Sequence, residues 1–115
     1  MKYLFIYGAF RDTSNDLLGG AIFCDKAFVF GRIYQVNEFY PGYIRDCCNK
    51  VYGDIYLVDE SIFDILDEYE GDEYELKKVY ASRMDSSIIE EVSIYEYKYG
   101  IDGFKEIVGG DWILR

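Results

Sequence analysis

The sequence contains no histidine, and this absence excludes a wide range of chemistry. Without histidine there can be no Ser-His-Asp or Cys-His catalytic arrangement, no histidine-ligated metal and no zinc deaminase chemistry. Acid–base chemistry in this protein must therefore be carried by Asp, Glu, Lys, Tyr or Cys side chains.

Cysteine is also scarce. There are three cysteines, an odd number, and Cys47 and Cys48 are adjacent, which is poor geometry for a disulfide framework. We therefore expect reduced thiols. Adjacent cysteines without histidine partners do not predict a metal site either.

A calcium site is likewise not expected in the acidic run at residues 67–75. Placing Gly71 at the sixth position of a calcium loop puts Leu66 at the first position, where a carboxylate is required. The sequence predicts neither a metal nor another cofactor.

Basic residues are few, with 12 Lys and Arg against 22 Asp and Glu, and the formal net charge is −10. A nucleic-acid binder needs a positive surface to displace counterions from phosphates, and the same negative field would be repelled by an anionic membrane. No apolar run approaches the roughly 20 residues of a spanning helix, and the N-terminal run reaches Gly8 too soon for a signal peptide. We expect a cytoplasmic protein that binds neither nucleic acid nor membrane.

The chain has the size and composition of one ordinary domain. It has 115 residues, of which 50% are hydrophobic and 30% are charged, so it can bury a core. It has one proline, Pro41, and neither a low-complexity linker nor an internal repeat. Residues 1–115 are expected to form a single domain.

Six short segments rich in β-branched and aromatic residues predict strands, at residues 2–7, 27–36, 51–58, 74–82, 88–97 and 112–114. Central glycines at Gly31 and Gly53 indicate a strongly curved sheet, with a bend or bulge at Gly31. Residues 39–43 contain a Pro-Gly turn signal, and residues 12–18 could form one helical turn. The predicted fold is α+β, with a curled sheet or barrel of about six strands.

The clearest helix is predicted at residues 61–70, with Ser61 as N-cap and Gly71 as the C-terminal stop. At 100° per residue its apolar side chains occupy one arc about 160° wide. The arc consists of Ile62, Phe63, Ile65, Leu66 and Tyr69. The acids of the same helix that fall outside the arc, and are expected to face water, are Asp64, Asp67 and Glu68.

Glu70 is the one acid that falls inside the apolar arc, at about 80° on the same wheel. Burial there, and the negative end of the helix dipole, would both raise its pKa toward neutrality. Such a carboxyl suits general acid–base catalysis. The alternative is that the helix frays after Tyr69 and that Glu70 turns into solvent, because helix ends are uncertain by one or two residues.

Gly8 follows the first predicted strand. A loop at a strand end leaves backbone N–H groups free to hold an anion or a carbonyl oxygen. No GxGxxG or GxxxxGK[ST] pattern surrounds Gly8, so a nucleotide phosphate site is not predicted. A simple turn is the alternative interpretation of this glycine.

Six pieces of sequence, in this order, make the chain similar to the γ-glutamylcyclotransferase-like proteins over nearly its whole length. They are Tyr3 to Arg11 (YLFIYGAFR), Gly31 to Tyr34 followed by Tyr40 to Gly42, Val51 to Tyr56, Leu66 to Gly71 (LDEYEG), Tyr95 to Tyr97, and Gly110 to Trp112. The resemblance implies a small mixed β-barrel with one or more short flanking helices.

The resemblance also implies an activity and a site. Glu70, the glutamate before the glycine of the LDxxEG segment, is implied to be the acid–base catalyst, and Tyr7, Gly8, Ala9 and Phe10 are implied to bind the γ-glutamyl group. The implied reaction releases 5-oxoproline from a γ-glutamyl amine or peptide, by attack of the substrate's own α-amine on its γ-carbonyl. It needs neither cofactor nor metal, and we expect a monomer or homodimer.

The sequence departs from the family pattern at three positions. Ala9 stands where the family usually has Thr or Ser, Phe10 replaces Leu, and Leu76 stands where many bacterial members carry Arg. These departures motivate an alternative function, a non-catalytic protein that binds or sequesters a small molecule on the same fold. A purely structural or protein-interaction role would give no reason for an inward Glu70.

Overall fold

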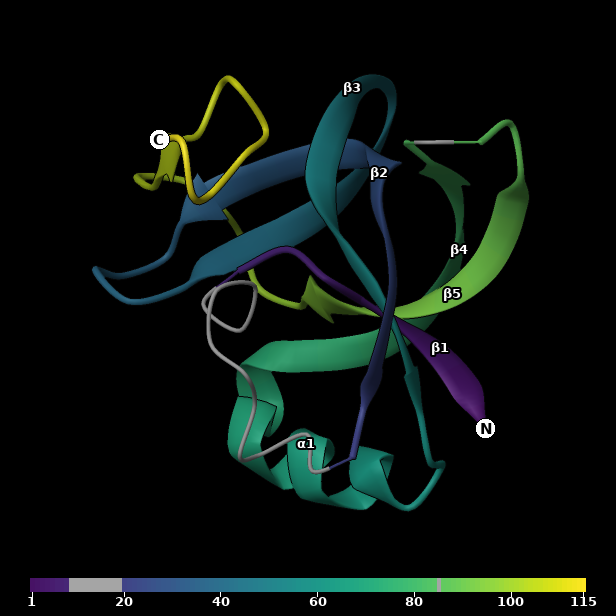
Figure 1. Ribbon diagram of the computed structural model, residues 1–115. Coiled ribbons are helices and arrows are strands. Elements are labelled where there is room, and N and C mark those ends of the chain that lie inside the picture. Colours follow the sequence, from purple (N-terminus) through teal and green to yellow (C-terminus); the bar gives the residue numbers. More distant parts are fainter. Residues whose placement is uncertain (9–19, 85) are drawn as a thin grey trace.

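The computed structural model describes residues 1–8, 20–84 and 86–115 (Figure 1). Within these ranges the elements are β1 (Lys2–Ile6), β2 (Ile22–Gln35), β3 (Pro41–Val58), α1 (Ile62–Glu70), the 3-10 turn η2 (Gly71–Glu73), β4 (Tyr74–Arg83), β5 (Ile89–Tyr97) and β6 (Lys105–Glu106). None of the helices in these ranges is long and apolar enough to cross a membrane. The helical turn predicted at residues 12–18 lies outside the described residues.

Five strands close into a barrel, as the sequence predicted. Antiparallel ladders join β1 to β3, β3 to β2, β2 to β4 and β4 to β5. A parallel contact between Leu4 of β1 and Ser93 of β5 closes the ring, so the barrel is mixed. The short β6 pairs with the end of β2 outside this ring. The fold is α+β, a small mixed β-barrel with a short flanking helix.

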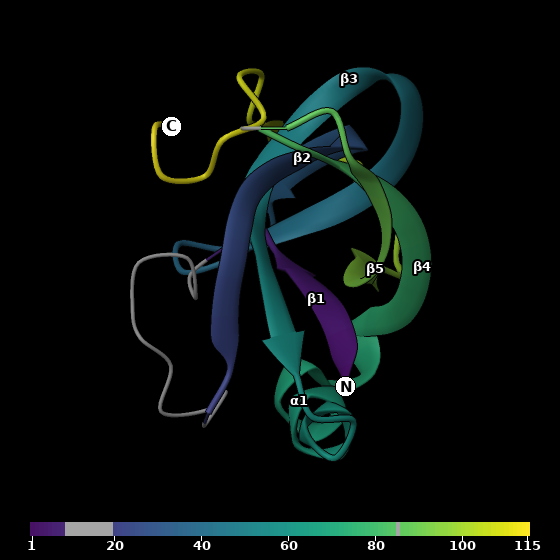
Figure 2. The ribbon, with the colours of Figure 1, turned by 45° about the vertical axis from the view of Figure 1, so that its right-hand side comes forward.

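The apolar side chains form two clusters. One fills the barrel and contains Val29, Ile33, Tyr43, Val51 and Ile55, all of them fully buried. The other lies where α1 covers one end of the barrel, and it joins Leu4, Ile6 and Val58 to Ile62 and Leu66 of the helix. Figures 1 and 2 both show α1 at this end, beside the N-terminus of the chain.

Two of the strands are longer than predicted. β2 begins at Ile22 rather than at residue 27, and β3 begins at Pro41 rather than at residue 51. The Pro-Gly pair that indicated a turn therefore opens a strand, which proline tolerates at a first position. β3 continues past this point because it pairs with β2 along almost the whole length of both strands.

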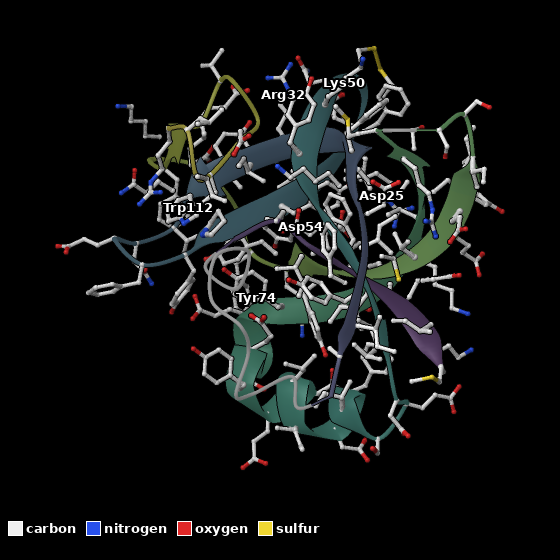
Figure 3. The ribbon with its side chains drawn as sticks, in the orientation of Figure 1. Asp25, Arg32, Lys50, Asp54, Tyr74 and Trp112 are labelled. Atoms are coloured by element: carbon white, nitrogen blue, oxygen red, sulfur yellow. A yellow bond between two sulfur atoms is a disulfide. The ribbon has the colours of Figure 1, made fainter. Side chains whose placement is uncertain are left out.

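The strand predicted at residues 112–114 is wrong. The last strand is β6, and Trp112 lies in an irregular segment, where its side chain is buried in the barrel cluster (Figure 3). Trp112 is buried in the core without strand pairing, whereas Ile113 and Leu114 are exposed.

The bulge predicted at Gly31 is confirmed. Phe30 pairs with Lys50 but Gly31 pairs with Arg45, so residues 46–49 of β3 protrude from the ladder. Gly31 also packs against the ring of Tyr43. The register at Gly53 is continuous, and there the missing side chain lets β1 approach closely.

Adding a methyl group at Gly53 is expected to destabilise the barrel. In Gly53→Ala the Cβ would lie 2.6 Å from Cζ of Phe5 and would also meet the carbonyl oxygen of Ile6. Because backbone cannot give way easily, we expect the free energy of unfolding to fall by about 2 kcal/mol in urea titrations. Gly100→Ala is the control, since a Cβ there meets nothing within 4 Å and φ is not positive. Equal stability of the two variants would contradict the close approach.

The expectation of three reduced thiols is wrong for one pair. Cys47 and Cys48 form a vicinal disulfide within the protruding segment of β3, near Lys50 (Figure 3), and Cys24 is free. Adjacency made the pair unsuitable for linking distant parts of the chain, but not for bonding to each other. The disulfide lies on an exposed segment and joins no two elements of the fold.

Candidate active site

Helix α1 follows a turn organised by Asp59. The Asp59 side chain accepts a hydrogen bond from the backbone N–H of Ser61 at 3.0 Å, and its carbonyl oxygen accepts one from Ile62 at 3.0 Å. Ser61 occupies the predicted N-cap position but makes no side-chain cap bond. At the other end Gly71 has φ 73°, and its N–H bonds to the carbonyl of Asp67, which confirms the predicted glycine stop.

The helix buries a narrower face than the wheel predicted. Ile62 and Leu66 are buried, but Ile65 is 51% exposed and Tyr69 is 63% exposed. The helix therefore rests on the barrel along one edge of the predicted arc. Its last residue, Glu70, is half-buried, so the alternative in which the helix frays after Tyr69 is wrong.

A cavity of about 140 Å³ lies between this edge of α1 and the barrel. Its walls come from four parts of the chain and are largely apolar or aromatic. They consist of residues 4–8 of β1 and its end, Tyr40 and Pro41 at the start of β3, Leu66, Tyr69 and Glu70 of α1, and Tyr74 and Tyr95 of β4 and β5. Figure 3 shows Tyr74 where β4 leaves the helix. Among the described lining residues, Glu70 is the only carboxylic acid.

Burial raises the pKa of Glu70 from its ordinary value of 4.5 to about 7. The cause is desolvation, which disfavours the charged form of a carboxyl group in apolar surroundings. At neutral pH this group is therefore close to half protonated. A carboxyl group with such a pKa can both accept and donate a proton.

Three buried tyrosines surround Glu70, and each donates its hydroxyl proton to another group. Tyr7 Oη donates to the carbonyl oxygen of Tyr95 at 2.6 Å, and Tyr74 Oη donates to the carbonyl oxygen of Pro41 at 2.7 Å. Tyr95 Oη donates to Asp67 Oδ1 at 2.6 Å. Burial raises the pKa of all three phenols, and the charge of Glu70 adds to the rise in each. The hydroxyl protons of these three tyrosines are therefore committed to groups other than Glu70.

Gly8 lies at the end of β1 and packs against Pro41. A Cβ at Gly8 would lie 2.9 Å from Pro41 Cδ, so a side chain there would press on the start of β3. Tyr74 holds the Pro41 carbonyl from the other side. The missing side chain of Gly8 thus lets the end of β1 lie close to the proline at the cavity wall.

The structure brings together three of the five residues predicted for the site. Glu70, Tyr7 and Gly8 all line the cavity, although Tyr7 belongs to the buried network as well. Ala9 and Phe10 lie outside the described residues.

Sequence reasoning missed four further residues of the cavity wall, Tyr40, Tyr69, Tyr74 and Tyr95. It assigned the thirteen tyrosines only to the core, its rim or an unspecified pocket. Position alone could have suggested Tyr69, which precedes Glu70, and Tyr74, which opens the next strand. The place of Tyr95 depends on how β5 pairs with β1 and β4.

The fold and the site define a small mixed β-barrel protein with one carboxyl group in a largely aromatic cavity. A family model described as "Gamma-glutamyl cyclotransferase, AIG2-like" matches residues 4–114, and the chain belongs to this family. The resemblance seen in the sequence is confirmed. Membership of this family supports a cyclotransferase-type function. No curated protein matches the chain.

Solved structures share the fold. YkqA from Bacillus subtilis aligns with a TM-score of 0.78 and 24% identity. The alignment covers 96% of this chain but only 39% of the YkqA chain. An AIG2-like protein from Mus musculus aligns with a TM-score of 0.73 and 18% identity, over 87% of this chain and 80% of the mouse chain. A gamma-glutamyl cyclotransferase aligns with a TM-score of 0.72 and 15% identity, over 91% of this chain and 69% of its own.

Proposed function

We propose that this protein is a γ-glutamyl cyclotransferase that releases 5-oxoproline from a γ-glutamyl amine or peptide. The observation that carries the proposal is the half-buried Glu70, whose pKa is raised to about 7 and which shares a cavity with Gly8. Membership of the family supports the same reaction class.

In the proposed reaction Glu70 acts first as a base. The substrate's α-amine enters as an ammonium ion, and only its neutral form is a nucleophile, so the Glu70 carboxylate takes one proton. The nitrogen then attacks the γ-carbonyl carbon, which forms the C–N bond of a five-membered ring. Because both reacting groups belong to one molecule, the protein needs only to hold them in the attack geometry.

Glu70 then acts as an acid. It returns its proton to the departing nitrogen as the original amide bond breaks. The Glu70 carboxylate then takes the second proton from the ring nitrogen and passes it to the released amine, which leaves as an ammonium ion, so that the carboxylate is regenerated. Backbone N–H groups at and after Gly8 would hold the developing oxyanion, a contact worth about 3 kcal/mol for each donor. Ala9 and Phe10 keep their proposed substrate-binding roles from the sequence.

A panel of γ-glutamyl amines and dipeptides tests the proposal, with 5-oxoproline as the measured product. Turnover that depends on Glu70 supports it. Tight ligand binding without product, in the natural protein and in Glu70→Gln alike, would instead support the alternative of a non-catalytic binding protein. The replacement of a family hydroxyl by Ala9 is the observation that favours this alternative.

The pH dependence of kcat/KM is expected to follow the ionisation of Glu70. Below about pH 7 the carboxyl group is protonated and cannot accept the ammonium proton, so kcat/KM should fall about tenfold per pH unit. Above that pH it should level off. Initial rates between pH 5 and 8 measure the midpoint. A profile that is flat down to pH 5 would show that the working base has an ordinary pKa.

A further inference from the structure

Asp67 belongs to the LDEYEG segment, yet the proposed reaction gives it no role. The helical wheel predicted that it faces water, and as a residue it is exposed. Its carboxylate nevertheless accepts a 2.6 Å hydrogen bond from Tyr95 Oη, a group of the cavity wall. Bonds of this length to an ionised acceptor are among the stronger hydrogen bonds of proteins.

Tyr95 connects the two walls of the cavity. Its side chain bonds to Asp67 on α1, and its backbone carbonyl accepts the hydroxyl proton of Tyr7 on the opposite wall at 2.6 Å. Tyr7 immediately precedes Gly8. One buried residue of β5 therefore ties the helix that carries Glu70 to the strand end that carries Gly8.

The bond from Tyr95 reaches the helix near its C-terminal end, close to Glu70. Asp67 and Glu70 are three residues apart, so they are neighbours on the helix surface. The helix has nine residues, and its neighbouring side chains Ile65 and Tyr69 are largely exposed. Buried Leu66 and the bond from Tyr95 to Asp67 both attach the C-terminal half of the helix to the barrel.

We propose that Asp67 and Tyr95 are positioning residues, which hold the Glu70 carboxyl at a set distance from the end of β1 and keep the Tyr95 hydroxyl away from it. This inference rests on the proposed function for its catalytic consequence. Its structural part, the direction in which Tyr95 donates its proton, can be tested without turnover.

The described ionisable groups that face Glu70 are phenols. They are Tyr7 of β1, Tyr40 before β3, Tyr69 of α1, Tyr74 of β4 and Tyr95 of β5. Tyr7 and Tyr74 donate to backbone carbonyls, which no side-chain substitution at Asp67 removes. Of these three bonded phenols, Tyr95 is the one that donates to a replaceable side chain, so its proton can be redirected by a substitution at Asp67.

Asp67→Ala removes the acceptor, and the freed Tyr95 hydroxyl is expected to donate to Glu70, the other described carboxyl at hand. A hydrogen bond to the charged form lowers a carboxyl pKa. We therefore expect the 13C NMR titration midpoint of the Glu70 carboxyl to fall by about one pH unit. A displacement of about 1 Å can cost about 100-fold in rate, so kcat should fall by about 10- to 100-fold, with KM changed by less than about threefold.

Asp67→Asn is the matched control, because the amide oxygen still accepts a hydrogen bond while the charge is lost. It should retain kcat within about threefold and leave the Glu70 midpoint near 7. Glu68→Ala, which removes an exposed acid of the same helix, should change neither quantity. If Asp67→Ala and Asp67→Asn lose the same fraction of kcat, the charge of Asp67 is what matters and the inference is overturned. It is also overturned if both variants keep the kcat and the Glu70 midpoint of the natural protein.

Tyr95→Phe gives a second test that does not require Asp67→Ala to fold. It keeps the ring but has no hydroxyl proton, so we expect a lower kcat with the Glu70 midpoint unmoved. A fall of that midpoint in Tyr95→Phe would contradict the inference. If the natural protein forms no 5-oxoproline but its Glu70 midpoint still falls in Asp67→Ala, the proposed function fails and the positioning role of Asp67 stands.

Discussion

Replacing Glu70 with glutamine is expected to slow 5-oxoproline release by about 1,000-fold, within the range that general acid–base catalysis contributes. Glutamine has nearly the shape of glutamate, but it cannot take the ammonium proton of the substrate. The cavity offers no described substitute, because Glu70 is its only described carboxylic acid and its tyrosines have raised pKa values. Chromatographic measurement of 5-oxoproline under saturating substrate gives the rate directly.

Glu68→Gln is the control for this substitution. Glu68 lies on the same helix, is exposed and does not line the cavity, so the same chemical change there should leave the rate unaltered. Undiminished turnover in Glu70→Gln would assign the proton transfer to another group. Circular dichroism of both variants establishes that the barrel and helix are intact.

The inward position of Glu70 could be predicted from the sequence because it depends on local rules. The helical period and the glycine at position 71 fix the last turn, and they place Glu70 beside Leu66 on the buried side. The same wheel overestimated the burial of Ile65 and Tyr69. A wheel reports which side chains share a face, whereas the width of the contact depends on the shape of the barrel end.

The role of Asp67 could not be predicted in this way. Its bond partner, Tyr95, is 28 residues away and reaches the helix only because β5 pairs with both β1 and β4. Barrel closure is a tertiary event with no local signature. The same limit explains why the sequence placed β3 ten residues too late, since only pairing with β2 carries that strand past the Pro-Gly signal.

Several expectations concern properties outside the fold and stay predictions. They are the single domain, the cytoplasmic location, the monomer or homodimer, and the lack of nucleic-acid binding. The family match, residues 4–114, covers all of the segments that suggested the family except Tyr3 at the start of the first one.

Glu70→Gln is also expected to stabilise the protein, and only at higher pH. The pKa of Glu70 is raised from 4.5 to about 7 by burial, so the folded state binds a proton more tightly than the unfolded state does. The free energy of unfolding contributed by this group is therefore largest below pH 4.5, and it is lost as the pH rises to about 7. The loss amounts to about 3 kcal/mol for a shift of this size.

Glutamine carries no charge at any of these pH values, so it escapes this loss. At pH 5 the two proteins should be close in stability, whereas at pH 8 Glu70→Gln should be more stable by about 3 kcal/mol, or roughly 10 °C in Tm. Urea titrations at a series of pH values measure the difference between the two proteins, in which the other carboxyl groups cancel. Parallel stability curves would show that Glu70 ionises as freely in the folded protein as in the unfolded chain. A gap that opens between pH 4.5 and 7 would instead show that the fold gives up stability to keep this carboxyl group out of water, which is the condition for its proposed exchange of protons with an amine.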